Sequence, residues 1–85
     1  MSSTGWVKYV AELVAYQGAA RPFQRYTMGI VRGIDPLAAA SAADIRWGPA
    51  TDRQWWECTP VDKASQYQLE AANAREEEEA RNHGA

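Results

Sequence analysis

The chain has few of the groups that commonly carry catalysis. Its 85 residues include one cysteine, Cys58, and one histidine, His83. A single cysteine excludes an internal disulfide and a multi-cysteine metal site, and it favours a reducing, cytoplasmic setting. His83 stands in a polar tail with no neighbour to hold its imidazole for acid–base work. We interpret Cys58 as a small apolar residue of a strand rather than as a nucleophile.

Patterns typical of cofactor, metal and membrane sites are also absent from the sequence. The glycines match no phosphate-binding loop, and the aspartates fall at predicted caps and turns rather than in a metal-binding cluster. No apolar run approaches the roughly 18 residues of a membrane-spanning helix, and the first residues lack the blocks of a signal peptide. We therefore expect a soluble, non-enzymatic protein with no cofactor and no metal.

The charges are nearly balanced but unevenly distributed. Nine basic and eleven acidic side chains give a net charge of -2. Residues 1–61 hold six basic and five acidic side chains, and residues 62–85 hold three basic and six acidic ones. A charged fraction of 24% is typical of a folded domain, and a chain of this length allows one small core. We expect a core domain over 1–61 and an acidic C-terminal helix and tail over 62–85.

Two strands joined as a hairpin are predicted in the first part of the chain. Residues 6–16 are rich in aromatic and β-branched side chains, which favours a strand, although a helix remains the alternative because Trp6, Val10 and Leu13 also share a helical stripe. Gly and Pro within 17–22 predict a loop, and 23–32 follow as the second strand. Its period-2 pattern places Tyr26, Met28 and Ile30 on one face and Arg25, Thr27 and Val31 on the other.

The clearest local signal is a helix over residues 36–47. Asp35 is suited to cap its N-terminus, Pro36 suits the first helical position, and Gly48 with the following proline ends it. Small alanines allow the helix to lie close to the sheet, with Leu37, Ile45 and Trp47 as its expected anchors.

A second helix is predicted from the segment Thr59-Pro60 to about residue 81, with Thr59 as cap and Pro60 at the first position. It has little large apolar surface to bury, so its last half should be solvated. The expected i,i+4 ion pairs in its acidic stretch are Arg75 with Glu79 and Glu77 with Arg81.

A third strand over 53–58 carries two adjacent tryptophans. Neighbours in a strand point to opposite faces, so one of Trp55 and Trp56 should face the core and the other the far side of the sheet. The nine aromatic rings of the chain either fill a small core or serve as hot spots for binding. The expected binding residues are Trp55, Trp56, Arg25, Tyr26, Arg32 and Arg53.

These elements predict an α+β fold, a small antiparallel sheet of about three strands with one packed alanine-rich helix (ββαβ) and an exposed C-terminal helix. The segment Asp35-Pro36-Leu37-Ala38-Ala39-Ala40, closing in Trp47-Gly48-Pro49, resembles small phage-encoded inhibitors of the anti-CRISPR type, over roughly residues 23–58. The resemblance implies a viral protein of the host cytoplasm that binds a host CRISPR surveillance complex and blocks DNA recognition or nuclease recruitment. It assigns no functional residues.

Two other functions stay open. A phage structural or assembly protein could pair its sheet edges between copies, as a small homo-oligomer rather than a monomer. A nucleic-acid-binding module could use the arginines and aromatic rings, although the near-zero charge and the acidic tail make this the less favoured alternative.

Overall fold

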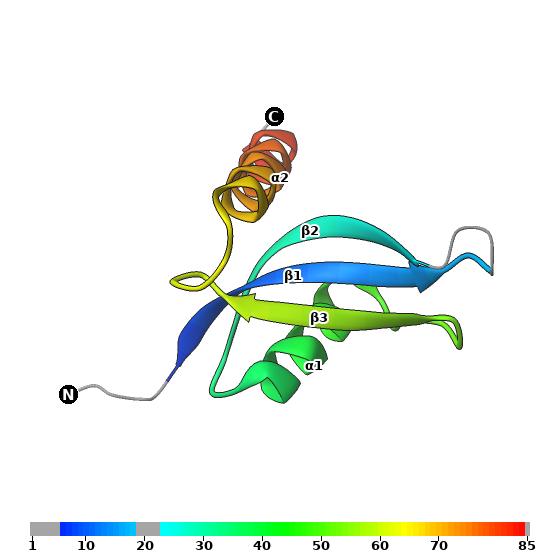
Figure 1. Cartoon of the computed structure of the whole chain (residues 1–85). Coiled ribbons are helices and arrows are strands. Elements are labelled where there is room, and N and C mark those ends of the chain that lie inside the picture. The colour runs from blue at the N-terminus through cyan, green and yellow to red at the C-terminus, as the bar shows by residue number, and fades with distance from the viewer. Residues whose placement is uncertain (1–5, 19–22, 85) are drawn as a thin grey trace.

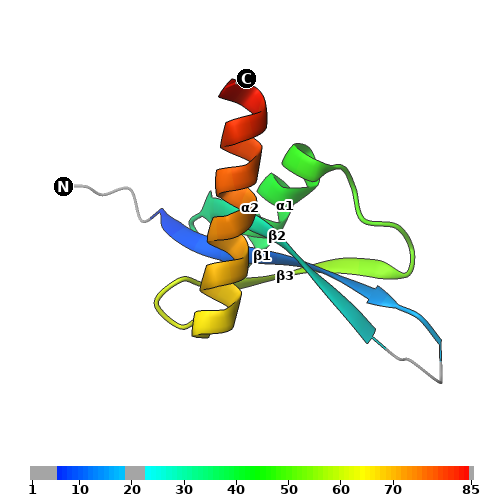
Figure 2. The same cartoon turned by 90° about the horizontal axis from the view of Figure 1, so that it is seen from above.

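The fold of the protein is α+β, with two helices on opposite sides of one sheet (Figure 1). The computed structural model describes residues 6–18 and 23–84, so the first residues and most of the expected 17–22 loop lie outside the described part. The elements are β1 (Val7–Tyr16), β2 (Phe23–Gly33), α1 (Pro36–Trp47), β3 (Gln54–Pro60) and α2 (Gln66–Gly84). The strands form an antiparallel sheet in the order β2-β1-β3. Seen from above, α2 crosses the sheet (Figure 2).

The central strand β1 provides most of the core. Its strand conformation decides between the strand and the helix that the sequence left open. Tyr9 and Ala11 face α1 and belong to the buried cluster on that side. Val10 and Val14 alternate with them onto the opposite face, and both are fully buried.

The edge strand β2 contains a β-bulge. Consecutive residues of β1 pair with Thr27 and Gly29, which makes Met28 the extra residue. The bulge shifts the alternation of side chains by one position. Ile30 therefore lies on the same face as Arg25, and the predicted two-face pattern of this strand is wrong beyond Thr27.

Both predicted ends of α1 are confirmed. The backbone N–H of Ala38 donates to Oδ1 of Asp35 at 2.7 Å, and Pro36 begins the helix. Gly48 follows the last helical residue with a φ of 98°, a left-handed conformation that glycine adopts without strain. These signals lie within a few residues of each helix end, which is why the sequence revealed them.

The face that α1 turns to the sheet was predicted wrongly. A Cβ on Gly33 would lie 2.6 Å from the backbone nitrogen of Ala39, so the helix and β2 approach each other closely. Only methyl side chains fit at such a distance. Leu37 and Ile45, the expected anchors, are 78% and 86% exposed, whereas Trp47 does pack against the core. The residues that α1 buries fully are Ala39 and Ala43.

The start of the second helix was also predicted wrongly. β3 continues through Thr59 and Pro60, and a turn follows before α2 begins. The actual cap is a capping box: the N–H of Gln68 donates to Oγ of Ser65 at 3.1 Å, and the N–H of Ser65 donates to Oε1 of Gln68 at 2.8 Å. Thr59 pairs with the central strand instead, so tertiary pairing overrides its local capping signal.

The middle of α2 is attached to the rest of the fold rather than fully solvated. Ala72 is completely buried, and Glu76 and Glu79 both pair with Arg46 of α1. The expected pair of Arg75 with Glu79 is therefore wrong. The expected i,i+4 pair of Glu77 with Arg81 is present, with a distance of 3.7 Å.

Candidate protein-binding surface

The two adjacent tryptophans of β3 have different environments. Trp56 turns toward α1, where its indole N–H donates to the carboxylate of Asp44 and its ring lies 5.7 Å from that of Trp47. Trp55 turns to the other face and remains 39% exposed. Trp56 is thus the core residue of the pair, and Trp55 is the one available to a partner.

Trp55 belongs to a row of aromatic rings across all three strands. Phe23 of β2 contacts Trp55 edge-on, with ring centroids 5.7 Å apart, and Tyr16 of β1 contacts Phe23 at 6.0 Å. The three rings are 39%, 58% and 43% exposed for Trp55, Phe23 and Tyr16. Edge-to-face contacts fix their orientation. We call these three residues the aromatic face.

The sequence prediction missed Tyr16 and Phe23. The signal that could have found them is their position at the two ends of the predicted hairpin loop. Cross-strand neighbours next to a hairpin loop lie opposite each other, and the register indeed pairs Tyr16 with Phe23.

A charged network borders the aromatic face. Nη1 of Arg25 donates to Oε1 of Glu57, and the indole N–H of Trp55 donates to Oε2 of the same carboxylate at 3.2 Å. The hydrogen bond from Arg25, with a smaller contribution from Trp55, lowers the pKa of Glu57, and the bond to Glu57 raises the pKa of Arg25. Glu57 therefore stays ionised and holds both side chains in place.

Glu12 is the buried carboxylate of this face, and the sequence prediction did not single it out. It is 7% exposed and lies on the central strand, on the same side as Val10 and Val14. Nε2 of Gln68 in α2 donates to Oε1 of Glu12 at 3.1 Å, and Nη1 of Arg25 lies 3.7 Å from the same oxygen. A buried carboxylate needs such polar partners, and the bond from Gln68 connects the central strand to α2.

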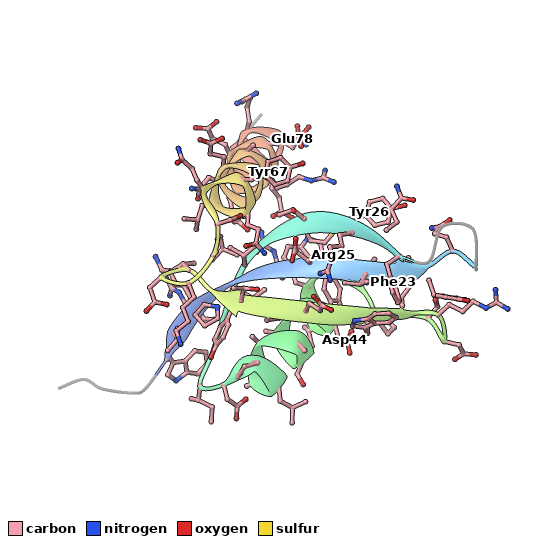
Figure 3. All side chains as sticks on the ribbon, in the orientation of Figure 1. Phe23, Arg25, Tyr26, Asp44, Tyr67 and Glu78 are labelled. Carbon is pink, nitrogen blue, oxygen red and sulfur yellow. The ribbon has the colours of Figure 1, made fainter. Side chains whose placement is uncertain are left out.

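A groove of about 690 Å³ continues from the aromatic face along α2. Figure 3 shows Arg25 and Phe23 on the side of the sheet where α2 carries Tyr67, while Asp44 lies on the opposite side with α1. Arg25 belongs to both the groove and the network beside the aromatic face. The groove is lined by Glu12, Arg25, Tyr26, Thr27, Tyr67, Gln68, Ala71 and Arg75.

The structure brings together only part of the predicted set. Trp55, Arg25 and Tyr26 line the aromatic face or the groove. Arg53 is exposed in the turn just before β3, where its carbonyl accepts from the N–H of Tyr16 at 2.8 Å. Arg32 lies at the far end of β2 and lines a separate cavity of about 750 Å³.

Cys58 of β3 is partly buried. Burial raises the pKa of Cys58 to about 11, so it is a protonated thiol near neutral pH. Within residues 6–18 and 23–84, no group of three or more His, Cys, Asp or Glu side chains could hold a metal ion. None of the helices in this part of the chain is long and apolar enough to cross a membrane. The side chain of His83 lies outside the described part.

Comparison of the chain with models of protein families, with curated proteins and with solved structures gave no significant match.

Proposed function

We propose that the chain is a non-enzymatic protein that binds another protein through the aromatic face and covers a surface that its target needs. The observation that carries this proposal is the exposure of three mutually packed rings, Tyr16, Phe23 and Trp55, beside the Arg25–Glu57 pair. Aromatic and arginine side chains held rigidly in a cluster are the composition typical of binding hot spots. Because the rings are fixed before binding, little side-chain entropy is lost on association.

The arginines support a protein rather than a nucleic acid as partner. Arg25 is paired with Glu57 and Glu12, and Arg46 is paired with Glu76 and Glu79. Cations that are already neutralised by carboxylates release few counterions on binding a phosphate backbone. A nucleic-acid site would also have to overcome the acidic residues of α2.

The resemblance of the 35–49 segment to anti-CRISPR inhibitors adds a specific target to the proposal. That target is a protein subunit of a host CRISPR surveillance complex, with loss of DNA recognition or nuclease recruitment as the result. A purified surveillance complex tests this part directly, by DNA binding and cleavage with and without the chain. Unchanged DNA binding and cleavage at saturating chain would remove this target but leave the protein-binding surface to be tested.

The surface itself is tested with Trp55→Ala and a matched control, Leu37→Ala. Both replace an exposed apolar side chain, but Leu37 lies on α1, away from the aromatic face. Tagged wild-type chain and both variants are used to capture proteins from host lysate, and the captured protein is then purified for affinity measurement. We expect Trp55→Ala to lose about 2 kcal/mol of binding, close to 30-fold in affinity, while Leu37→Ala binds as wild type.

Thermal unfolding of the three proteins provides the folding control. Trp55→Ala should unfold near the wild-type temperature, because its ring lies on a partly exposed face. A target that binds wild type and Trp55→Ala equally well would contradict the aromatic face as the binding surface. Binding that instead falls steeply with salt and requires DNA or RNA would favour the nucleic-acid alternative.

A further inference from the structure

The middle of the outer edge of β2, at Thr27 and Ile30, is covered by side chains from both helices. The N–H of Ile30 donates to Oε2 of Glu76 at 2.8 Å, and the carbonyl of Ile30 accepts from Nη1 of Arg46 at 2.8 Å. The carbonyl of Thr27 accepts from Nε of Arg75 at 3.1 Å. These bonds occupy backbone groups that an added strand would need, so this edge is protected.

The other edge strand, β3, points a different set of backbone groups outward. Tyr16 N–H donates to the Arg53 carbonyl at 2.8 Å, and Val61 N–H donates to the Lys8 carbonyl at 3.0 Å, at the two ends of the β1–β3 ladder. In an antiparallel ladder, residues that bond to the neighbouring strand alternate with residues that do not. The residues whose backbone groups point away from β1 are therefore Gln54, Trp56, Cys58 and Pro60, and the carbonyl of Pro60 already accepts from the N–H of Lys63 at 2.9 Å.

Most of these outward groups have no partner within the described part of the chain. Gln54 N–H is used by the carbonyl of Thr51 at 3.0 Å. No described hydrogen bond engages the carbonyl of Gln54 or either backbone group of Trp56 and Cys58. β3 packs against β1 and α1 only, so no other described element covers this edge.

We propose that β3 pairs with β3 of a second copy of this chain, antiparallel and around a two-fold axis at Trp56. The two sheets then form one continuous six-stranded sheet. Trp56 N–H donates to the carbonyl of the second copy's Trp56 and receives the reciprocal bond. Cys58 N–H donates to the second copy's Gln54 carbonyl, again twice by symmetry.

The side chains select this register over its neighbours. It places Trp55 opposite Glu57 of the second copy, which are already hydrogen-bonded partners within one chain. A shift toward the C-terminal end of the strand would set Glu57 opposite its own copy, and like charges in direct opposition are destabilising. A shift the other way would pair Gln54 with Trp56, and because Gln54 N–H is already bonded, only two bonds within the strands would remain, against four in the proposed register.

Pairing of this kind stops at two copies. A two-fold contact uses the same edge on both chains, and the β2 edges left at the ends of the joined sheet are interrupted by the bulge at Met28 and covered at Thr27 and Ile30 by Glu76, Arg46 and Arg75. The aromatic faces of both copies lie on the same side of the joined sheet, with the two Trp55 residues near the axis. A partner would therefore meet a doubled aromatic surface.

The first test measures the mass of the purified wild-type chain by sedimentation equilibrium, from micromolar to sub-millimolar concentration, together with hydrogen exchange of single amides by NMR. We expect the mass of two chains, and exchange at Trp56 and Cys58 slowed by about tenfold or more in the dimer. The amide of Arg32, which points outward from the protected edge at a site far from β3, serves as control and should not change. A monomer at every concentration, or equal exchange at Trp56 and Cys58 throughout, overturns the proposal.

The second test fixes the register by cross-linking. Gln54→Cys places a thiol opposite Cys58 of the second copy, so mild oxidation should give a disulfide-linked dimer. Wild type, whose Cys58 residues are not opposite each other in this register, and Thr51→Cys, whose new thiol lies before the strand, should stay mostly uncross-linked. A dimer that Gln54→Cys cross-links no better than Thr51→Cys contradicts the β3 pairing.

This inference fails separately from the proposed function. A monomeric protein that still needs Trp55 to bind its target would overturn the dimer and leave the aromatic face intact. A dimer that binds its target equally well with and without the Trp55 side chain would overturn the aromatic face and leave the β3 pairing intact.

Discussion

Glu76 of α2 accepts a hydrogen bond from the backbone N–H of Ile30 at 2.8 Å, across the outer edge of β2. The same carboxylate lies 2.9 Å from Nη1 of Arg46 in α1. One acidic side chain from a charge-rich helix thus connects both helices to the sheet edge. The acidic stretch of α2 is consequently part of the fold and more than a solvated tail.

Removal of this carboxylate should destabilise the protein. We expect Glu76→Ala to cost about 1 to 2 kcal/mol of the free energy of unfolding, because the N–H of Ile30 and the guanidinium of Arg46 each lose an acceptor. Glu78→Ala is the matched control, since Glu78 is exposed and its Arg75 partner is 3.8 Å away. Urea unfolding measures both, and an equal effect of the two variants would contradict the role of Glu76.

The contribution of Glu76 should depend on pH. Burial alone would raise the pKa of Glu76, but hydrogen bonds from Arg46 and from Ile30 N–H outweigh it and lower the pKa below 4.5. A carboxyl with a lowered folded-state pKa stabilises the fold above its unfolded pKa and loses that effect as the pH falls through the folded value. The difference in unfolding free energy between wild type and Glu76→Ala should therefore shrink below about pH 4.5. A difference that stays constant down to pH 3 would contradict it.

Gly29 should not tolerate a side chain. A Cβ there would collide with Oε2 of Glu76 and lie 3.0 Å from the ring of Trp47, in a backbone conformation with φ of 156°. We expect Gly29→Ala to lose about 2 kcal/mol or more, because steric conflict adds to backbone strain. Gly18→Ala is the control: its φ is 112°, but nothing lies within 4 Å of the new Cβ. Thermal unfolding compares the two variants. An equal loss of stability in both would contradict the close packing of Glu76 and Trp47 against Gly29.

Substitutions on the exposed side and on the buried side of α1 should change the unfolding free energy by different amounts. Ile45→Gln should change the unfolding free energy by less than about 0.5 kcal/mol, because Ile45 is 86% exposed. Ala43→Leu should cost about 1 to 3 kcal/mol, since the fully buried Ala43 faces the sheet with no room for a larger side chain. Denaturant unfolding of both variants would disprove this orientation if Ile45→Gln were the more damaging change.

Cys58 should make stability fall at alkaline pH. Its pKa is raised from 9.0 to about 11 by burial, so the folded state holds the thiol proton more tightly than the unfolded state does. The resulting stabilisation is complete below pH 9.0 and is lost as the pH rises toward about 11. Cys58→Ala, which lacks the thiol, provides the reference. If the unfolding free energies of wild type and Cys58→Ala changed in parallel between pH 9 and 11, the burial of this thiol would be contradicted.

Features governed by near neighbours could be predicted from the sequence. Asp35 and Pro36 begin α1, Gly48 ends it, and the alternation of Trp55 and Trp56 required one ring on each face of the sheet. These signals act over one to four residues, through a cap, a fixed φ or the pleat of a strand. The α+β class followed from them, although residues 6–16 stayed open between strand and helix and the second helix was predicted to start too early.

The candidate site was only partly predictable. Trp55 and Arg25 could be selected by residue type, but the row of rings requires the β2-β1-β3 pairing that brings Phe23 beside Trp55. Arg32 has the same residue type as Arg25 and yet lies at the far end of its strand. Residue type alone indicates candidate binding residues, and the register of the sheet determines which of them lie close together.

What the sequence determined by itself was the identity and ends of the locally encoded elements. Tertiary structure alone decided the bulge at Met28, the outward turn of Leu37 and the attachment of Glu76 to Ile30, a contact between residues 46 positions apart. It also covered the middle of the β2 edge with side chains from the helices and left most outward backbone groups of β3 without a partner among the described residues. The physical reason is that burial and edge pairing are shared between distant segments, so their energies depend on which segments meet and not on any local stretch of residues.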